Sequence, residues 1–256
     1  MELETAIKNT IEYAKKFKSW VNRKEIAERL VSPKEFSEEE INGLLKRFIN
    51  KNKKNKYFNE KFYKAAGLAK TIETNFGDIL FLGLSGSVAS GHPKKSDDID
   101  FLIVTKGNRL WKTRLGLRWW MFKNRIPHRK YRGKEKKDEF CFNLWLDENH
   151  LWLPTDKQNL KNSVDLVLLK PLINKNQTYE KFFLVNNWAK KWVATPYFNK
   201  VKDVRYKILD KKIKQNNFDK VINCLYFWPQ YWYMKRKISK ETVGLYQAFF
   251  HRQMVK

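Results

Sequence analysis

Residues 81–105 of this 256-residue chain read FLGLSGSVASGHPKKSDDIDFLIVT. The apolar run from Ile79 to Leu84 has the length of a strand, and the turn Ser85-Gly86-Ser87 follows it directly. Gly86 permits a tight turn and a close backbone approach to a ligand. Ser87 supplies a hydroxyl and an amide where a helix begins, a place that favours anions. The stretch therefore predicts a strand, an anion-binding turn and, after a polar loop, a second strand.

The second strand carries two aspartates one residue apart, Asp98 and Asp100. Alternate side chains of a strand share a face, so these carboxylates point the same way, about 7 Å apart along the strand. Mg²⁺ takes hard oxygen ligands and leaves room for substrate phosphates. We therefore expect Asp98 and Asp100 to hold Mg²⁺ or Mn²⁺ beside a triphosphate. The alternative is that Asp97 and Asp98 cap a loop and that Asp100 is a charge at the strand edge.

The turn and the aspartate pair resemble the signature of the DNA polymerase β-like nucleotidyltransferase superfamily, in which Gly-Ser is followed, after a loop, by Asp-apolar-Asp-apolar. Ten residues, 88–97, separate Ser87 from Asp98 in this chain. The resemblance implies that Gly86 and Ser87 bind the triphosphate of an NTP and that Asp98 and Asp100 bind the metal ions. We expect Lys94 and Lys95, which lie in the intervening loop, to steady phosphates.

Members of this superfamily usually place a third Asp or Glu on a later strand. The best candidate strand is FCFNLWL, residues 140–146, and the position that resembles the third-carboxylate slot holds Asn143. An amide oxygen binds a metal weakly and cannot act as a base. Asp147 is the alternative, because period two places it on the same face as Asn143, about 13 Å further along the strand.

The chain is strongly basic, with 53 Lys and Arg against 27 Asp and Glu and a formal net charge of +26. Thirteen of the basic residues and one acid, Glu135, lie between positions 106 and 137. Such a cluster favours a polyanionic partner, because neutralised phosphates release counterions. The alternatives are a composition rich in Lys and Asn, or a solvated helix face. The residues that we expect to contact nucleic acid, on a helix over 108–124 and a loop over 129–137, are Arg109, Lys112, Arg129, Lys130 and Arg132.

The overall pattern predicts an α+β fold in three consecutive parts: a helical domain at 1–56, a small mixed sheet with a polymerase β-like core at 57–150, and a helical domain at 151–256. Helical spacing marks 6–17, 23–30 and 37–48 in the first part. These helices and the basic stretch 51–57 resemble a winged-helix module, with a simple three-helix cap as the alternative. In the last part we expect helices over 164–172, 179–192, 219–233 and 240–253.

The last part is rich in large aromatic residues. Their helical spacing favours a helical core, and the alternative is that they stack on nucleic-acid bases beside the basic run 235–237. The aromatic residues concerned are Trp188, Trp192, Tyr226, Phe227, Trp228, Tyr231, Trp232 and Tyr233. The stretches LLKPLINKNQTYEKF (168–182), NNWAKKW (186–192) and QAFFH (247–251) are similar to bacterial proteins in which a winged-helix-like segment precedes a nucleotidyltransferase domain and a helical tail.

The sequence thus predicts a Mg²⁺-dependent enzyme that transfers a nucleoside monophosphate from an NTP to a nucleic-acid acceptor, with RNA, and a tRNA-like 3′ end, favoured. One alternative is transfer to a hydroxyl of a protein or small molecule. Another is a degenerate nucleic-acid-binding protein in which Asn143 marks the loss of activity. Two cysteines and four scattered histidines give no metal spacing and no disulfide framework. Without a signal peptide or a long apolar run, we expect a cytoplasmic protein that makes no membrane contact.

Overall fold

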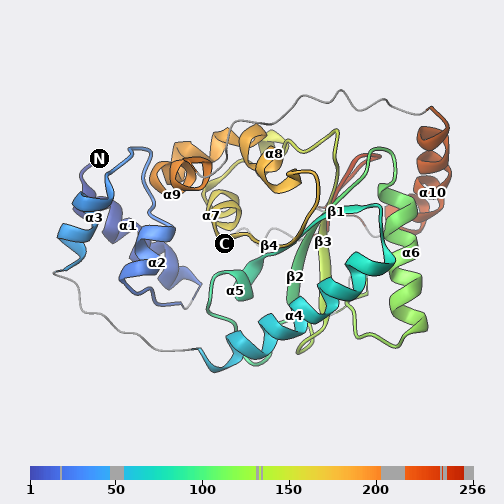
Figure 1. The fold of residues 1–256 in the computed structure, drawn as a ribbon, viewed down its shortest axis with the longest axis horizontal. Coiled ribbons are helices and arrows are strands. Elements are labelled where there is room, and N and C mark those ends of the chain that lie inside the picture. Colours follow the sequence, from blue (N-terminus) through green and yellow to red (C-terminus); the bar gives the residue numbers. More distant parts are fainter. Residues whose placement is uncertain are drawn as a thin grey trace. The chain divides into compact units, whose positions relative to one another are not determined.

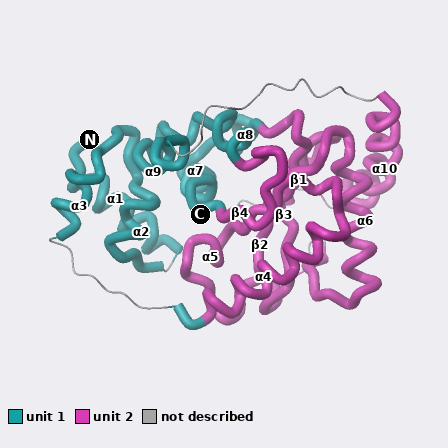
Figure 2. Tube along the Cα trace, viewed as in Figure 1, with its two compact units in different colours: residues 1–56, 152–169, 180–208 teal, residues 57–151, 170–179, 209–256 magenta. Residues whose placement is uncertain are grey.

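The computed structural model describes residues 1–17, 19–46, 55–130, 133, 135–202, 217–236, 238 and 241–250. The chain forms two compact units (Figure 2), one of residues 1–56, 152–169 and 180–208, the other of residues 57–151, 170–179 and 209–256. This division differs from the three consecutive parts that the sequence predicts. The C-terminal third contributes to both units because its segments pack against elements far away in the sequence.

The larger unit contains a six-stranded mixed sheet with the strand order β4-β1-β2-β3-β6-β5 (Figure 1). β2 and β3 run parallel, and every other neighbouring pair is antiparallel. The predicted α+β class is therefore confirmed. The strands are β1 Ile79–Leu84, β2 Ile99–Thr105, β3 Phe140–Asp147, β4 Lys170–Asn174, β5 Thr242–Val243 and β6 Gln247–Phe249.

Three of these strands lie where the sequence predicts helices. The predicted helix over 164–172 ends as α7 (Leu160–Leu168), and β4 begins at Lys170. The predicted helix over 240–253 is wrong, since β5 and β6 form an antiparallel pair there, and residues 251–253 lie outside the described part of the chain. In both places a distant strand, β1 or β3, supplies the hydrogen-bonding edge that decides the conformation.

The hydrophobic core of this unit joins the sheet to α4 (Lys56–Asn75), α6 (Leu110–Lys123) and α10 (Asn217–Lys235). The odd-numbered residues of β2, Ile99, Phe101 and Ile103, belong to this core. Because side chains alternate along a strand, Asp100 faces the other side of the sheet. The short helix α5 (Gly86–Ala89) follows β1 and leads into the loop before β2.

The smaller unit is helical in its described residues. α1 (Leu3–Lys16), α2 (Arg23–Glu28) and α3 (Glu38–Leu45) enclose a core of their own, and α7 and α9 (Lys190–Lys202) belong to the same unit. α2 and α3 each begin with a capping box, built on Asn22 with Glu25 and on Ser37 with Glu40. The three predicted N-terminal helices are therefore confirmed.

The chain before α9 is interrupted and does not form one continuous helix. α8 (Thr178–Val185) and the 3-10 turn Asn187–Ala189 precede α9 and replace the continuous helix predicted over 179–192. Most of the basic stretch 51–57 lies outside the described residues, which exclude 47–54. Among the described helices, none has the length and apolar character needed to cross a membrane.

Candidate metal and nucleotide site

The turn after β1 brings a glycine against a carboxylate. The Ser85 amide donates a hydrogen bond to the Asp100 carbonyl at 2.9 Å, which ties the turn to β2. Gly86 follows with φ +64°, a conformation that side chains rarely adopt. A Cβ atom at Gly86 would lie 2.5 Å from Asp100 Oδ2. The turn therefore requires glycine for its backbone angle and for its contact with the carboxylate.

Asp98 and Asp100 converge on one side of the sheet, as predicted. One carboxylate oxygen from each, together with the Cys141 sulfur, lies within 4.8 Å of the other two ligand atoms. Cys141 joins them because it pairs with Asp100 in the parallel register of β2 and β3. The two carboxylates are thus close enough to share a cation.

Asp98 is almost completely buried, and it forms an ion pair in which Arg129 Nη1 lies 3.1 Å from Asp98 Oδ2. Burial raises the pKa of Asp98 to about 6, the nearby charge of Asp100 adds to this, and Arg129 opposes it. The ionised pair is therefore costly in the absence of a further positive charge. A bound divalent cation fits this deficit, and its hard oxygen ligands would come from Asp98 and Asp100.

Asn143 lies in the predicted third-carboxylate slot and contacts Asp100. Its Nδ2 donates a hydrogen bond to Asp100 Oδ1 at 2.6 Å, and its Oδ1 accepts one from the Cys141 thiol at 2.8 Å. Burial, reinforced by the neighbouring aspartates, raises the pKa of Cys141, so its sulfur stays a protonated donor. Asn143 therefore orients Asp100 but offers no base, and the carboxylates are the hard ligands here.

Asp147 does not reach this site, so the expectation that it shares a face with Asn143 is wrong. The register of β3 shifts at Asn143, because Phe142 pairs with Phe101 and Leu144 with Leu102. This extra residue reverses the alternation, and Asp147 pairs with Thr105 on the core-facing side. The buried Asp147 carboxylate instead accepts hydrogen bonds from the backbone amides of Asn108 and Asn149.

The loop residues predicted to bind triphosphate differ in exposure. Ser87 is half-buried in α5, and its carbonyl accepts hydrogen bonds from Ser90 Oγ at 2.9 Å and from the His92 amide at 3.1 Å. Lys94 and Lys95 are exposed in the loop between α5 and β2. The structure therefore places both lysine side chains where a phosphate in solution can reach them.

The residues predicted to contact nucleic acid differ in their exposure and in their ion pairs. Arg109 pairs with Asp219 of α10 at 2.6 Å, and Arg129 pairs with Asp98, so both guanidinium groups serve internal contacts. Lys112 is half-buried on α6 and Lys130 is exposed, whereas Arg132 lies outside the described residues.

Lys61 on α4 is a site residue that the sequence reasoning missed. Its side chain is only 1% exposed, and Nζ donates hydrogen bonds to the Asp97 carbonyl and to Asp138 Oδ1, each at 2.6 Å. Lys61 thereby anchors the residue before Asp98 to a core helix. Its position was detectable, because 58, 61, 65, 68 and 72 follow the helical spacing of the buried face.

Comparisons of the chain with protein-family models, with curated proteins and with solved structures found no match. Its function therefore has to be inferred from the geometry and chemistry of the described site.

Proposed function

We propose that this protein is a Mg²⁺-dependent nucleotidyltransferase with a polymerase β-like core, which transfers a nucleoside monophosphate from an NTP to a nucleic-acid acceptor. The net charge of +26 suits a nucleic-acid acceptor. Among nucleic acids we favour RNA, with a tRNA-like 3′ end as the specific case. The observation that carries the proposal is the convergence of Asp98 and Asp100 beside a turn where Gly86 leaves no room for a side chain.

The donor set suits a hard divalent cation. Asp98 and Asp100 would hold Mg²⁺ or Mn²⁺, which when bound neutralises phosphate charge and polarises the phosphoryl group under attack. Gly86 lets the turn approach Asp100 closely, and Lys94 and Lys95, which are exposed in the following loop, would add positive charge for a triphosphate. Lys61 fixes the approach of the chain to Asp98 by holding the Asp97 carbonyl.

In the proposed reaction, an acceptor hydroxyl oxygen forms a bond to the α-phosphorus of the NTP. The bond between that phosphorus and the bridging oxygen breaks, and pyrophosphate leaves. Asn143 cannot take the hydroxyl proton, and Asp147 lies on the opposite face, so the proton passes to solvent. The chain would therefore work with two carboxylates, and Asn143 would serve to orient Asp100.

A nucleic-acid-binding protein without turnover is the second candidate. It is favoured by the amide at position 143 and by the ion pair between Arg129 and Asp98, which places a guanidinium where positive charge is needed. Transfer to a protein hydroxyl stays open as a variant of the enzyme. An aminoglycoside acceptor fits poorly, because a polycation is repelled by so basic a chain.

The test incubates the full chain with each of the four NTPs labelled at the α-phosphate, with Mg²⁺ or Mn²⁺ and with total RNA. The site variant is Asp98→Asn with Asp100→Asn, and the matched control is Asp78→Asn, a half-buried carboxylate that precedes β1 and pairs with Lys106. We expect label in RNA from wild type and control but not from the site variant. Label on protein instead of RNA would identify a protein hydroxyl as the acceptor. No label with any NTP, together with retained RNA binding, would overturn the enzyme and support the second candidate.

A further inference from the structure

The outer face of α10 is an exposed apolar surface. Aromatic and aliphatic side chains recur there at spacings of three and four, which is one stripe of a helix. The members of the stripe are Phe218 (68% exposed), Val221 (57%), Leu225 (67%), Trp228 (48%) and Trp232 (64%). An exposed apolar stripe of this length indicates a binding surface.

The expectation that the aromatic residues of this region form a core is therefore only partly right. Phe227 is buried against Trp111 of α6, and Met234 is buried in the same core. Trp228, Trp232 and Tyr233 are exposed instead. The reason is geometric, because α10 is apolar on more than one face and only the face toward α6 and the sheet meets the core (Figure 1).

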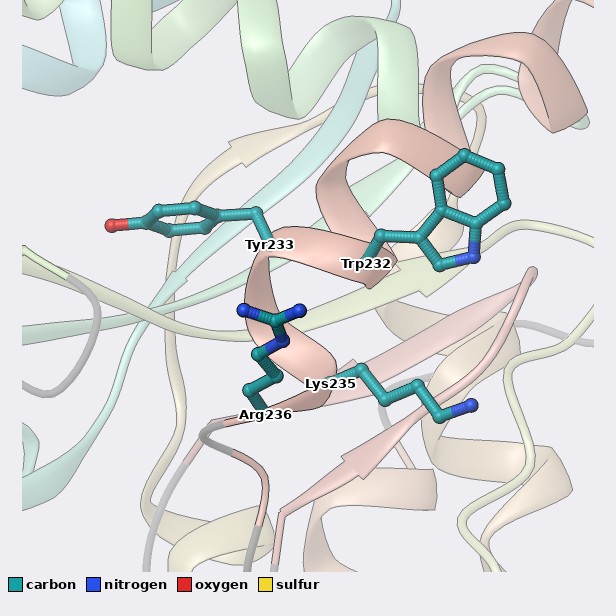
Figure 3. A pocket seen from close by; sticks show the side chains of 4 residues that line it. All are labelled: Trp232, Tyr233, Lys235 and Arg236. Carbon is teal, nitrogen blue, oxygen red and sulfur yellow. The ribbon is translucent and has the colours of Figure 1, made fainter.

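A hollow of about 460 Å³ lies at the C-terminal end of α10, lined by Trp232, Tyr233, Lys235 and Arg236. Figure 3 shows Trp232 and Lys235 extending to one side of the helix and Tyr233 to the other, with the Arg236 side chain between them. Two aromatic rings and two cations match a ligand that carries a flat ring and a phosphate.

We propose that the C-terminal half of α10 binds single-stranded nucleic acid, with RNA as the natural form. Bases would stack on Trp228 and Trp232, which share the stripe, and backbone phosphates would pair with Lys235 and Arg236. Exposed aromatic faces interleaved with cations are the usual means of binding unpaired strands. Identifying the bound strand as the acceptor rests on the proposed function, whereas the binding itself does not.

This surface is separate from the carboxylate site. α10 contributes Phe227 and Met234 to the core that contains Phe101, on the face of β2 opposite to Asp100. A strand held on α10 would have to pass around the edge or end of the sheet to reach Asp100. The α10 surface therefore retains a longer acceptor rather than positioning its reacting hydroxyl.

Other occupants match the surface less well. A symmetric pairing of two copies needs self-complementary groups. In the described residues of α10 the one acid is Asp219, which is already paired with Arg109, so a second copy offers no carboxylate from α10 to Lys235 and Arg236. A helix that lies on a bilayer inserts one apolar face, whereas Trp232 and Tyr233 extend to opposite sides of α10 (Figure 3).

Stacking on the rings and pairing with the cations should affect the affinity for a single strand and its salt dependence differently. Stacking of a base on an aromatic side chain is worth enough that its loss should weaken binding by about 5- to 140-fold per ring. Each phosphate neutralised on a single strand contributes about 0.7 to the slope of log affinity against log salt. Loss of Lys235 and Arg236 should therefore lower that slope by about 1.4, whereas loss of the rings should leave it unchanged.

The experiment measures the anisotropy of a labelled oligouridylate of about twelve nucleotides, within the site sizes of such surfaces, over a range of salt. It uses the full chain, Trp228→Ala with Trp232→Ala, and Lys235→Ala with Arg236→Ala. The matched control is Tyr63→Ala with Lys70→Ala on α4, where Tyr63 is 72% exposed. All substituted side chains are exposed, and thermal unfolding confirms that each variant folds.

We expect the ring variant to bind many-fold more weakly with the same salt slope, the cation variant to lose slope, and the control to match wild type. Unchanged oligouridylate affinity in the ring variant would overturn the proposal. In that case, ring-dependent binding to phosphatidylserine vesicles would identify a bilayer surface, and a ring-dependent dimer in sedimentation would identify a second copy.

Failure of this proposal is distinguishable from failure of the proposed function. The variant Asp98→Asn with Asp100→Asn removes negative charge away from α10, so its oligouridylate affinity should equal or exceed that of wild type. Binding without nucleotidyl transfer in wild type would refute the enzyme and leave the α10 surface intact. Transfer with unchanged binding in the ring variant would refute the surface alone.

Discussion

Asp98→Asn should stabilise the protein in the absence of metal, although it removes one partner of an ion pair. The folded state raises the pKa of Asp98 to about 6, mainly through burial, from about 3.9 in an unfolded chain. A raised acid pKa means that the fold disfavours the ionised form. Stability is therefore greatest below the unfolded pKa and falls as the pH rises from about 4 to about 6.

The magnitude follows from that difference. Two pKa units correspond to about 3 kcal/mol at pH values well above 6. The Asn amide lacks the charge, but it also makes a weaker contact with Arg129, so we expect a net gain of roughly 1–3 kcal/mol at pH 8. Near pH 4, where the wild-type carboxyl is largely protonated in the fold, the gain should vanish.

The assay is urea unfolding of wild type, Asp98→Asn and the control Asp78→Asn in EDTA, at several pH values between 4 and 8. Mg²⁺ should then stabilise wild type more at pH 8 than at pH 5, since a bound ion and the Asp98 proton compete, and it should stabilise Asp98→Asn less. If Asp98→Asn is less stable than wild type at pH 8 in EDTA, the Arg129 contact outweighs burial and the reasoning is wrong.

Three further changes test the same region. Gly86→Ala would force a Cβ against the Asp100 carboxylate at a positive φ, so it should cost roughly 1–3 kcal/mol and weaken Mg²⁺-dependent stabilisation, measured by thermal shift. Asn143→Asp should cost roughly 2–4 kcal/mol in EDTA at pH 7.5, because repulsion between two carboxylates replaces the hydrogen bond from Asn143 to Asp100. Mg²⁺ should then stabilise this variant more than it stabilises wild type. An equal effect of Mg²⁺ on both proteins would contradict metal binding beside Asp100. Lys61→Met should cost roughly 2–4 kcal/mol at pH 7 by removing a buried partner of Asp138. Burial raises the pKa of Asp138, but hydrogen bonds from Lys61 and Lys64 outweigh burial and hold this pKa below its ordinary value. The cost of Lys61→Met should therefore shrink as the pH falls below about 4, and acid unfolding measures this change.

The parts of the site that follow from local sequence were predictable. A strand, a glycine turn and a second strand with alternating aspartates are encoded within residues 79–105, and the structure forms each of them. The position of Asp147 was not predictable, because one extra residue at Asn143 reverses the alternation of β3. A bulge of this kind depends on the neighbouring strands, and the pattern FCFNLWLD gives no sign of it.

Elements that depend on distant partners were misread. β4 pairs with β1 and β6 pairs with β3, and neither pairing is visible in the local pattern of residues 164–172 or 240–253. Helical spacing likewise shows that α10 is apolar but not which of its faces meets the core. Charge counts have the same limit, since Arg109 and Arg129 belong to the basic cluster by sequence yet form internal ion pairs.

Because β3 pairs with β6 near the end of the described chain, one edge of β3 can be completed only late in synthesis. Gln247, where β6 begins, follows Asp147 by one hundred positions, and the Phe250 amide donates a hydrogen bond to the Asn143 carbonyl at 2.9 Å. During synthesis the Gly86 turn and the aspartate strand emerge early, whereas β3 keeps an open edge until residues 247–250 arrive. Such late, long-range closure slows folding and exposes an unpaired strand. The ribosome-bound chain would thus carry the carboxylates of this site well before the backbone of Asn143 is held in place.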